Sequence, residues 1–127
     1  MTIHSLGDFH SVPNRPGMRL RKLVAAEHDV TSFYIDEFIL EQGASVPLHT
    51  HPIEEAFVVT AGTLTLQLGD DTLIAEAESV VRVPPGVPHA FRNTSPEPAR
   101  VLGAAAWNRV TFFREATTYL EGVPRTD

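Results

Sequence analysis

The sequence contains no cysteine, and this absence excludes disulfide bonds, thiolate metal sites and a cysteine nucleophile. It also lacks any apolar run that is long enough to span a bilayer. No signal-peptide pattern stands at the N-terminus, because no apolar stretch follows a basic one there. We therefore expect a cytoplasmic protein, and the missing cysteines fit a reducing compartment.

Basic side chains are few relative to acidic ones. The chain has 10 Lys and Arg against 16 Asp and Glu, and its formal net charge is −6 at pH 7. A negative protein is repelled by the phosphate backbone and by anionic lipids, so neither nucleic acid nor a membrane is an expected partner. The length of 127 residues fits a single domain, 1–127, with its own hydrophobic core.

What the sequence does contain is a series of short alternating segments separated by turn residues. In the clearest of them, Leu64 and Leu66 alternate with Thr63 and Thr65, as expected for a strand with one buried face. Strands are predicted over residues 18–24, 31–40, 55–62, 63–68, 72–75, 79–83 and 100–107. Many short strands of this kind favour an all-β sandwich or barrel.

The two ends of the chain differ from this pattern. Residues 1–17 contain prolines and a glycine that interrupt any long element, so we expect a loosely ordered N-terminal segment. Near the other end, Phe112, Ala116, Tyr119 and Leu120 fall at i, i+4, i+7 and i+8. This spacing predicts a short C-terminal helix over 111–121, packed outside the strands.

Four residues are spaced as a single metal site would require: His49, His51, Glu55 and His89. His49 and His51 are two positions apart, so on a strand both imidazoles point to the same face. A turn after His51 brings Glu55 back toward them. Three imidazoles and a carboxylate form a good ligand set for a divalent transition metal.

These segments resemble the two signature motifs of the cupin superfamily. The first motif, G-x5-H-x-H-x3-E-x6-G, is matched at every fixed position, by Gly43, His49, His51, Glu55 and Gly62. The second, G-x5-P-x-G-x2-H-x3-N, is matched by Pro84, Gly86, His89 and Asn93. The one departure is Glu78, which stands where the family usually has glycine. This departure concerns a turn and leaves the ligands intact.

The resemblance implies a jelly-roll (cupin-type) β-barrel with one divalent metal ion per chain inside it. The implied ligands are His49, His51, Glu55 and His89. Iron, manganese, zinc, nickel and copper all suit this set. Asn93 is expected to hydrogen-bond the backbone rather than to bind the metal.

The residues around the metal are predicted from strand alternation. Phe57 and Val59 share the face of Glu55, and Phe91 shares the face of His89. We expect these three side chains to line the barrel and to contact substrate.

Two further residues leave alternatives open. Arg82 either enters the barrel to meet an anionic substrate or faces solvent, and solvent is favoured because arginine is mostly exposed in proteins. Trp107 is either a wall of the cavity or part of the core.

The leading functional hypothesis follows from the resemblance. Four protein ligands leave two positions open on an octahedral ion. The resemblance to cupins with this ligand set implies a dioxygenase. Glu55 would then leave the metal and act as the catalytic base. We therefore expect a dioxygenase-type oxidoreductase acting on a small oxygen-bearing molecule. The alternatives are a metal-dependent isomerase or lyase, and a non-enzymatic module that binds a small molecule or a sugar.

A homodimer is the expected assembly. An isolated barrel of this size exposes edge strands, and the strand over residues 18–24 is a candidate to pair across a two-fold axis. The resemblance to the cupin family also implies a dimer.

Overall fold

The structure is a computed structural model that describes residues 3–106 and 117–119. Its elements in this part of the chain are β1 (His10–Ser11), β2 (Met18–Val24), the 3-10 helix η1 (Ala26–His28), β3 (Tyr34–Leu40), β4 (Ser45–Thr50), β5 (Glu55–Ala61), β6 (Thr63–Leu68), β7 (Asp71–Glu76), β8 (Ser79–Val83), β9 (His89–Arg92), β10 (Ala99–Ala105) and β11 (Thr118–Tyr119). The predicted all-β fold is confirmed.

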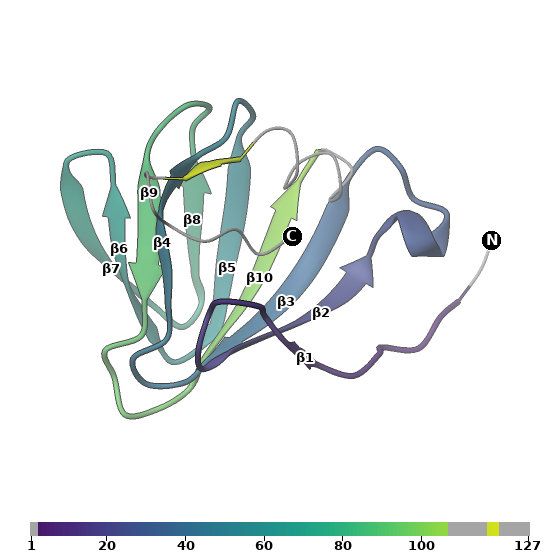
Figure 1. The fold of residues 1–127 in the computed structure, drawn as a ribbon, viewed down its shortest axis with the longest axis horizontal. Coiled ribbons are helices and arrows are strands. Elements are labelled where there is room, and N and C mark those ends of the chain that lie inside the picture. Colours follow the sequence, from purple (N-terminus) through teal and green to yellow (C-terminus); the bar gives the residue numbers. More distant parts are fainter. Residues whose placement is uncertain (1–2, 107–116, 120–127) are drawn as a thin grey trace.

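The strands form two antiparallel sheets that face each other (Figure 1). One sheet has the order β1-β2-β3-β10-β5-β8, and the other has the order β11-β4-β9-β6-β7. The chain crosses between the sheets after β4, which lies in the second sheet, to enter β5 in the first. Both segments that carry the motifs therefore contribute to the space between the sheets, as in a jelly roll.

The core lies between the inner faces of the two sheets. Phe38, Val59, Leu66 and Val101 belong to one contiguous cluster of buried apolar side chains. In β6 the expected alternation holds, since Leu64 and Leu66 are buried. Each such burial stabilises the fold by about 1.5–3 kcal/mol.

The turns of the two motifs use left-handed backbone. Gly43, Gly62 and Gly86 have φ of 84°, 74° and 75°. Glu78 also has a positive φ, 70°, so it adopts the conformation that the usual glycine would have taken. Its side chain is exposed, and its backbone N–H donates to Val59 O at 2.7 Å. The turn geometry is therefore kept in spite of the substitution.

Asn93 binds backbone groups, as predicted. The residue is fully buried, and its Nδ2 donates to Leu40 O at 2.9 Å and to Glu97 O at 2.7 Å. Its Oδ1 accepts the N–H of Ser95 at 2.9 Å. The side chain thus joins β3 to the loop after β9 and takes no part in the metal site.

The predicted C-terminal helix is not seen. Tyr119 and Thr118 instead form β11, in register with His49 and Thr50 of β4. The helix is wrong at these positions, because the open edge of β4 offers backbone hydrogen bonds that outweigh a short helical pattern. Residues 111–116, 120 and 121 lie outside the described part of the chain.

The N-terminal segment contains β1, which pairs with β2 at Arg19 and Leu20. This pairing covers part of the strand that was expected to meet a second copy across a two-fold axis. The homodimer stays a prediction. No helix in the described part of the chain is long and apolar enough to cross a membrane.

Candidate metal centre

The four predicted ligands meet at one end of the space between the sheets. His49 lies near the end of β4, His51 just beyond that strand, Glu55 at the start of β5 and His89 at the start of β9. All four are buried, and their ligand atoms lie within 4.8 Å of one another. His49 and His89 are register partners on neighbouring strands. The fold therefore brings the motif residues together.

The histidine rings are oriented by their Nδ1 atoms. His49 Nδ1 lies 2.7 Å from Pro47 O, and His89 Nδ1 lies 3.0 Å from Val87 O. A carbonyl oxygen only accepts hydrogen bonds, so in both rings Nδ1 must carry the proton. Each Nε2 then keeps its lone pair for a metal, a hydrogen-bonding arrangement that is usual around metal-binding histidines.

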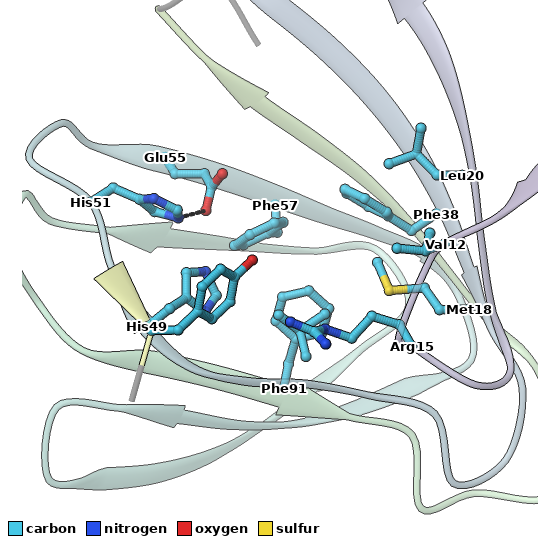
Figure 2. A pocket seen from close by; sticks show the side chains of 12 residues that line it. Val12, Arg15, Met18, Leu20, Phe38, His49, His51, Glu55, Phe57 and Phe91 are labelled. Carbon is cyan, nitrogen blue, oxygen red and sulfur yellow. Dashed lines mark ion pairs between the residues drawn. The ribbon is translucent and has the colours of Figure 1, made fainter. Parts of the chain in front are cut away.

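The third ring, of His51, contacts a residue near the C-terminal end of the chain. His51 Nδ1 lies 3.0 Å from the hydroxyl of Thr117, which directly precedes β11. Its Nε2 is 3.6 Å from Glu55 Oε1, an approach that Figure 2 marks with a dashed line. The His51 ring is thus turned toward the same point as the other ligands.

Glu55 has two oxygens in different surroundings. Oε2 accepts a hydrogen bond from the Tyr34 hydroxyl at 2.9 Å. Oε1 is buried and has no hydrogen-bond partner among the described residues, and the same holds for His89 Nε2, 3.4 Å away. Leaving such atoms unsatisfied is costly. Ligands at about 2.1 Å from one ion and at right angles to each other would be about 3 Å apart, so a metal fits between them.

His49 and His51 are neutral at pH 7 without a metal. Burial, the neighbouring His89 and the guanidinium of Arg15 together lower the pKa of His49 to about 4, although the hydrogen bond to the Pro47 carbonyl acts to raise it. Burial also lowers the pKa of His51 to about 2, with contributions from His49 and His89. Neutral imidazole is the form that binds metal, so the site is prepared for a cation at pH 7.

The metal centre opens on a cavity of about 40 Å³ between the two sheets (Figure 2). Phe57 and Phe91 line it, as predicted from strand alternation, and their ring centroids are 5.2 Å apart. Val59 is fully buried in the core and is not among the lining residues. The complete set of lining residues is Val12, Arg15, Met18, Leu20, Phe38, Val46, His49, His51, Glu55, Phe57, Phe91 and Tyr119.

Four residues at this site were not predicted from the sequence. Tyr34 and Thr117 hold Glu55 and His51. Arg15 and Tyr119 line the cavity, and the Arg15 guanidinium carbon lies 5.3 Å from the Tyr119 ring centroid. Arg15 stands in a turn between prolines, and no local pattern indicates that such an arginine is buried.

The two open alternatives have different outcomes. Arg82 is exposed on β8, so the solvent-facing alternative is the one that the structure supports. Trp107 lies outside the described residues. Glu54, next to the ligand Glu55, is also exposed.

Comparisons with known proteins agree with this geometry. A family model described as "Cupin domain" matches residues 36–104. The polyketide synthase CurC of Streptomyces cyaneus is 33% identical over 93 residues, which cover 71% of this chain. The chain spans 60% of the length of that relative.

Two solved structures are similar in fold. The polyketide cyclase RemF of Streptomyces resistomycificus superposes with a TM-score of 0.75 at 25% identity, over 89% of this chain and 79% of RemF. Oxalate decarboxylase of Bacillus subtilis, a protein with Mn(II) centres, superposes with a TM-score of 0.71 at 19% identity. That match covers 87% of this chain and 30% of the decarboxylase, and it bears on the fold alone.

Proposed function

The chain belongs to the cupin family, and on that premise we propose that it is a metal-dependent enzyme that closes a ring in a small, carbonyl-rich molecule. One observation carries the proposal: four buried ligand atoms lie within 4.8 Å of one another, and His49, His51 and Glu55 of this set line an apolar cavity. The likeness to the polyketide cyclase RemF and to the polyketide synthase CurC supports the substrate class.

The proposed cofactor is one divalent ion held by His49, His51, Glu55 and His89. Imidazole and carboxylate ligands suit iron, manganese, zinc, nickel and copper. When bound, such an ion supplies Lewis acidity, which polarises a carbonyl oxygen and makes the adjacent C–H group more acidic.

Glu55 is the proposed base. Its Oε2 is held by Tyr34, so Oε1 is the atom turned toward the other ligands and available to accept a proton. The hydrogen bond from Tyr34 would keep the carboxylate oriented while Oε1 accepts a proton. Tyr34 is itself buried, so water does not compete for this hydrogen bond.

Phe57 and Phe91 are proposed to bind the substrate carbon chain. Their edge-on arrangement in the cavity favours a planar apolar ligand and excludes water from the reacting atoms. The cavity of about 40 Å³ is narrow, so we expect its lining side chains to move apart when a substrate binds.

Reconstitution tests this proposal. Metal-free protein is loaded separately with Zn²⁺, Mn²⁺, Fe²⁺ and Ni²⁺, and its metal content is measured by elemental analysis. Each form is then incubated with linear polyketide mimics and β-diketones, with products followed by mass spectrometry and oxygen by an electrode. Ring closure appears as a product of unchanged composition or one that has lost water, without oxygen uptake. A Glu55→Gln variant should lose this activity.

Oxygenation is the second candidate. The four protein ligands would leave two positions open on an octahedral ion, enough for a substrate oxygen and dioxygen. Stoichiometric oxygen uptake with the Fe²⁺ form would favour this dioxygenase-type reaction. Turnover by an isomerisation or elimination without ring closure would favour the isomerase or lyase alternative. Tight binding of one ligand with no turnover by any metal form would favour a binding module.

A further inference from the structure

The two oxygens of the Glu55 carboxylate point to different partners. Oε1 lies 3.4 Å from His89 Nε2 and 3.6 Å from His51 Nε2. Oε2 accepts the hydrogen bond of the Tyr34 hydroxyl at 2.9 Å. Figure 2 shows one oxygen of the carboxylate directed at His51 and the other turned away from it. A single oxygen of Glu55 therefore faces the other ligands.

Tyr34 reaches Glu55 across an intervening strand. Tyr34 of β3 and Glu55 of β5 are both register partners of Ala105 in β10, so the three residues form one row across the sheet. Neighbouring strands lie about 4.8 Å apart, so the backbones of β3 and β5 are separated by about 10 Å. Ala105 has only a methyl group as its side chain, and this leaves the space over β10 to the long phenol.

Packing holds the phenol in this position. Tyr34 and Ala105 belong to one buried cluster, and Ile53 packs against it. Tyr34 is 1% exposed and Glu55 is 5% exposed, so their hydrogen bond lies in the interior. A hydrogen bond to a carboxylate is stronger than one between neutral groups. Oε2 could turn toward the histidines only by breaking this bond.

We propose that Tyr34 is a positioning residue that limits Glu55 to one metal contact, through Oε1. A carboxylate can bind a metal ion through one oxygen or through both. With Oε2 held by Tyr34, the histidines and Oε1 fill four positions of an octahedral ion, and two stay open. Without the hydroxyl, Oε2 can take one of these two positions.

This role specifies the substrate class as molecules that bind a metal ion through two oxygen atoms, such as β-diketones. Two open positions accept such a chelating molecule, whereas one position accepts only a single donor atom. The inference rests on the proposed function for the presence of the metal, and it adds the residue that keeps the second position open.

The test compares a ligand that binds through two atoms with a ligand that binds through one. The probes are acetohydroxamate, which chelates through two oxygens, and azide, which binds through one nitrogen. Both are small, as the narrow cavity requires. Each is titrated into Co²⁺-loaded protein, and the visible absorption of Co²⁺ reports binding, so the measurement needs no turnover.

Substitution of Tyr34 should change only one of the two affinities. Tyr34→Phe keeps the ring and its packing, so it should retain about one ion per chain and its affinity for azide. It should bind acetohydroxamate about tenfold more weakly, a typical effect of losing a hydrogen bond to a metal ligand. Ile53→Val is the control for packing, because it trims the contact with Tyr34 and keeps the hydroxyl. This control should leave both affinities as they are.

Wild-type protein that fails to bind acetohydroxamate would overturn the inference without any variant, so the test decides even if Tyr34→Phe does not fold. Loss of the metal from Tyr34→Phe, or equal weakening of both probes, would make Tyr34 a general structural support and would also overturn it. Unchanged affinities in Tyr34→Phe would do the same.

The outcome is separate from that of the proposed function. If acetohydroxamate binding alone is weakened but no polyketide mimic is turned over, ring closure fails and this inference stands. If ring closure is observed and Tyr34→Phe binds both probes as the wild type does, the proposed function stands and this inference fails.

Discussion

Two histidines of the candidate metal centre are oriented by carbonyl groups two residues earlier, and the third is oriented by Thr117, near the C-terminal end of the chain. His49 and His89 each direct Nδ1 to a carbonyl oxygen two residues earlier, at 2.7 and 3.0 Å. His51 directs Nδ1 to the hydroxyl of Thr117, 66 positions away. The first two orientations form with the strand or turn that contains each histidine. The orientation of His51 also requires the C-terminal segment to dock beside β4.

The candidate metal centre therefore has two parts. The barrel part is held by contacts within the barrel strands and turns, and the C-terminal part is held by the segment that contains Thr117 and β11. The barrel part includes the turns with positive φ that place the strands. The C-terminal part includes Thr117 and the neighbouring β11, whose Tyr119 covers His49. We expect the barrel part to determine whether a metal binds at all, and the C-terminal part to adjust how tightly it binds.

The largest effect is expected at a ligand of the barrel part. His89→Ala removes an imidazole that is 1% exposed and whose Nε2 has no hydrogen-bond partner among the described residues. Metal content by elemental analysis should fall from about one ion per chain to near zero. His10→Ala, at an exposed histidine of β1, is the control and should retain its metal. Unchanged metal content in His89→Ala would refute the ligand assignment.

The next effect is the loss of stability of the metal-free protein in acid. Burial lowers the pKa of His49 to about 4 and of His51 to about 2, whereas both lie near 6.5 in the unfolded chain. Below pH 6.5 the unfolded state therefore binds protons that the folded state does not, so stability is full above that pH and falls below it. Below pH 6.5 each histidine lowers the free energy of unfolding by about 1.4 kcal/mol per pH unit. At pH 5 the two histidines together lower it by on the order of 4 kcal/mol.

Urea titrations of the metal-free protein between pH 7.5 and 5 measure this slope. His49→Gln should flatten the curve by the contribution of one proton, which separates that histidine from the carboxylates. A free energy of unfolding that does not change over this range would contradict the assignment. In the metal-bound protein the same protons compete with the ion, so metal should also be released in acid.

A somewhat smaller effect is expected at the turn after β5. Gly62 has φ of 74°, and a Cβ added there would lie 2.5 Å from the backbone oxygen of Pro98. Gly62→Ala should therefore lower the free energy of unfolding by about 3 kcal/mol, because backbone must move. At Gly43, with φ of 84°, an added Cβ meets nothing within 4 Å. Gly43→Ala should lower the free energy of unfolding by about 1 kcal/mol, because only the positive φ is strained. Equal losses in chemical denaturation would contradict this difference.

The smallest effect tests the C-terminal part of the comparison. Thr117→Val keeps the shape of the side chain and removes the hydroxyl that contacts His51. Metal affinity, measured by competition with a chelator, should fall about tenfold, as is typical when a partner of a metal-binding histidine is lost. Thr118→Val, at an exposed position of β11, is the matched control. An unchanged affinity in Thr117→Val would show that His51 is oriented within the barrel after all.

The same division explains what could be predicted from the sequence. The strands over 18–24 and 79–83 have the predicted bounds, because each is defined by local alternation and by turn residues at its ends. The four ligands lie within two short motifs, and strand geometry alone directs His49 and Glu55 inward. Features of this kind depend on neighbours a few residues apart.

Contacts between distant segments could not be predicted in this way. The buried Arg15 lies 5.3 Å from the ring of Tyr119 in β11, and Tyr34 reaches Glu55 from a strand 21 positions earlier. The tail was predicted as a helix because its apolar spacing also fits one face of a helix. Only the open edge of β4 decides in favour of a strand at Tyr119. The spacing of a few apolar residues does not indicate whether an unpaired strand edge lies beside them in the fold.

Glu78 has a consequence for how relatives of this chain are recognised. The second motif is usually written with glycine at this position, yet the glutamate here takes the same left-handed torsion with its side chain in solvent. The turn requires a positive φ at this position. A non-glycine residue can adopt that angle at a cost of about 1–2 kcal/mol. A pattern that demands the letter G would pass over this chain and over others with intact ligands. Asparagine and aspartate, which tolerate the same torsion best, are the substitutions to admit first.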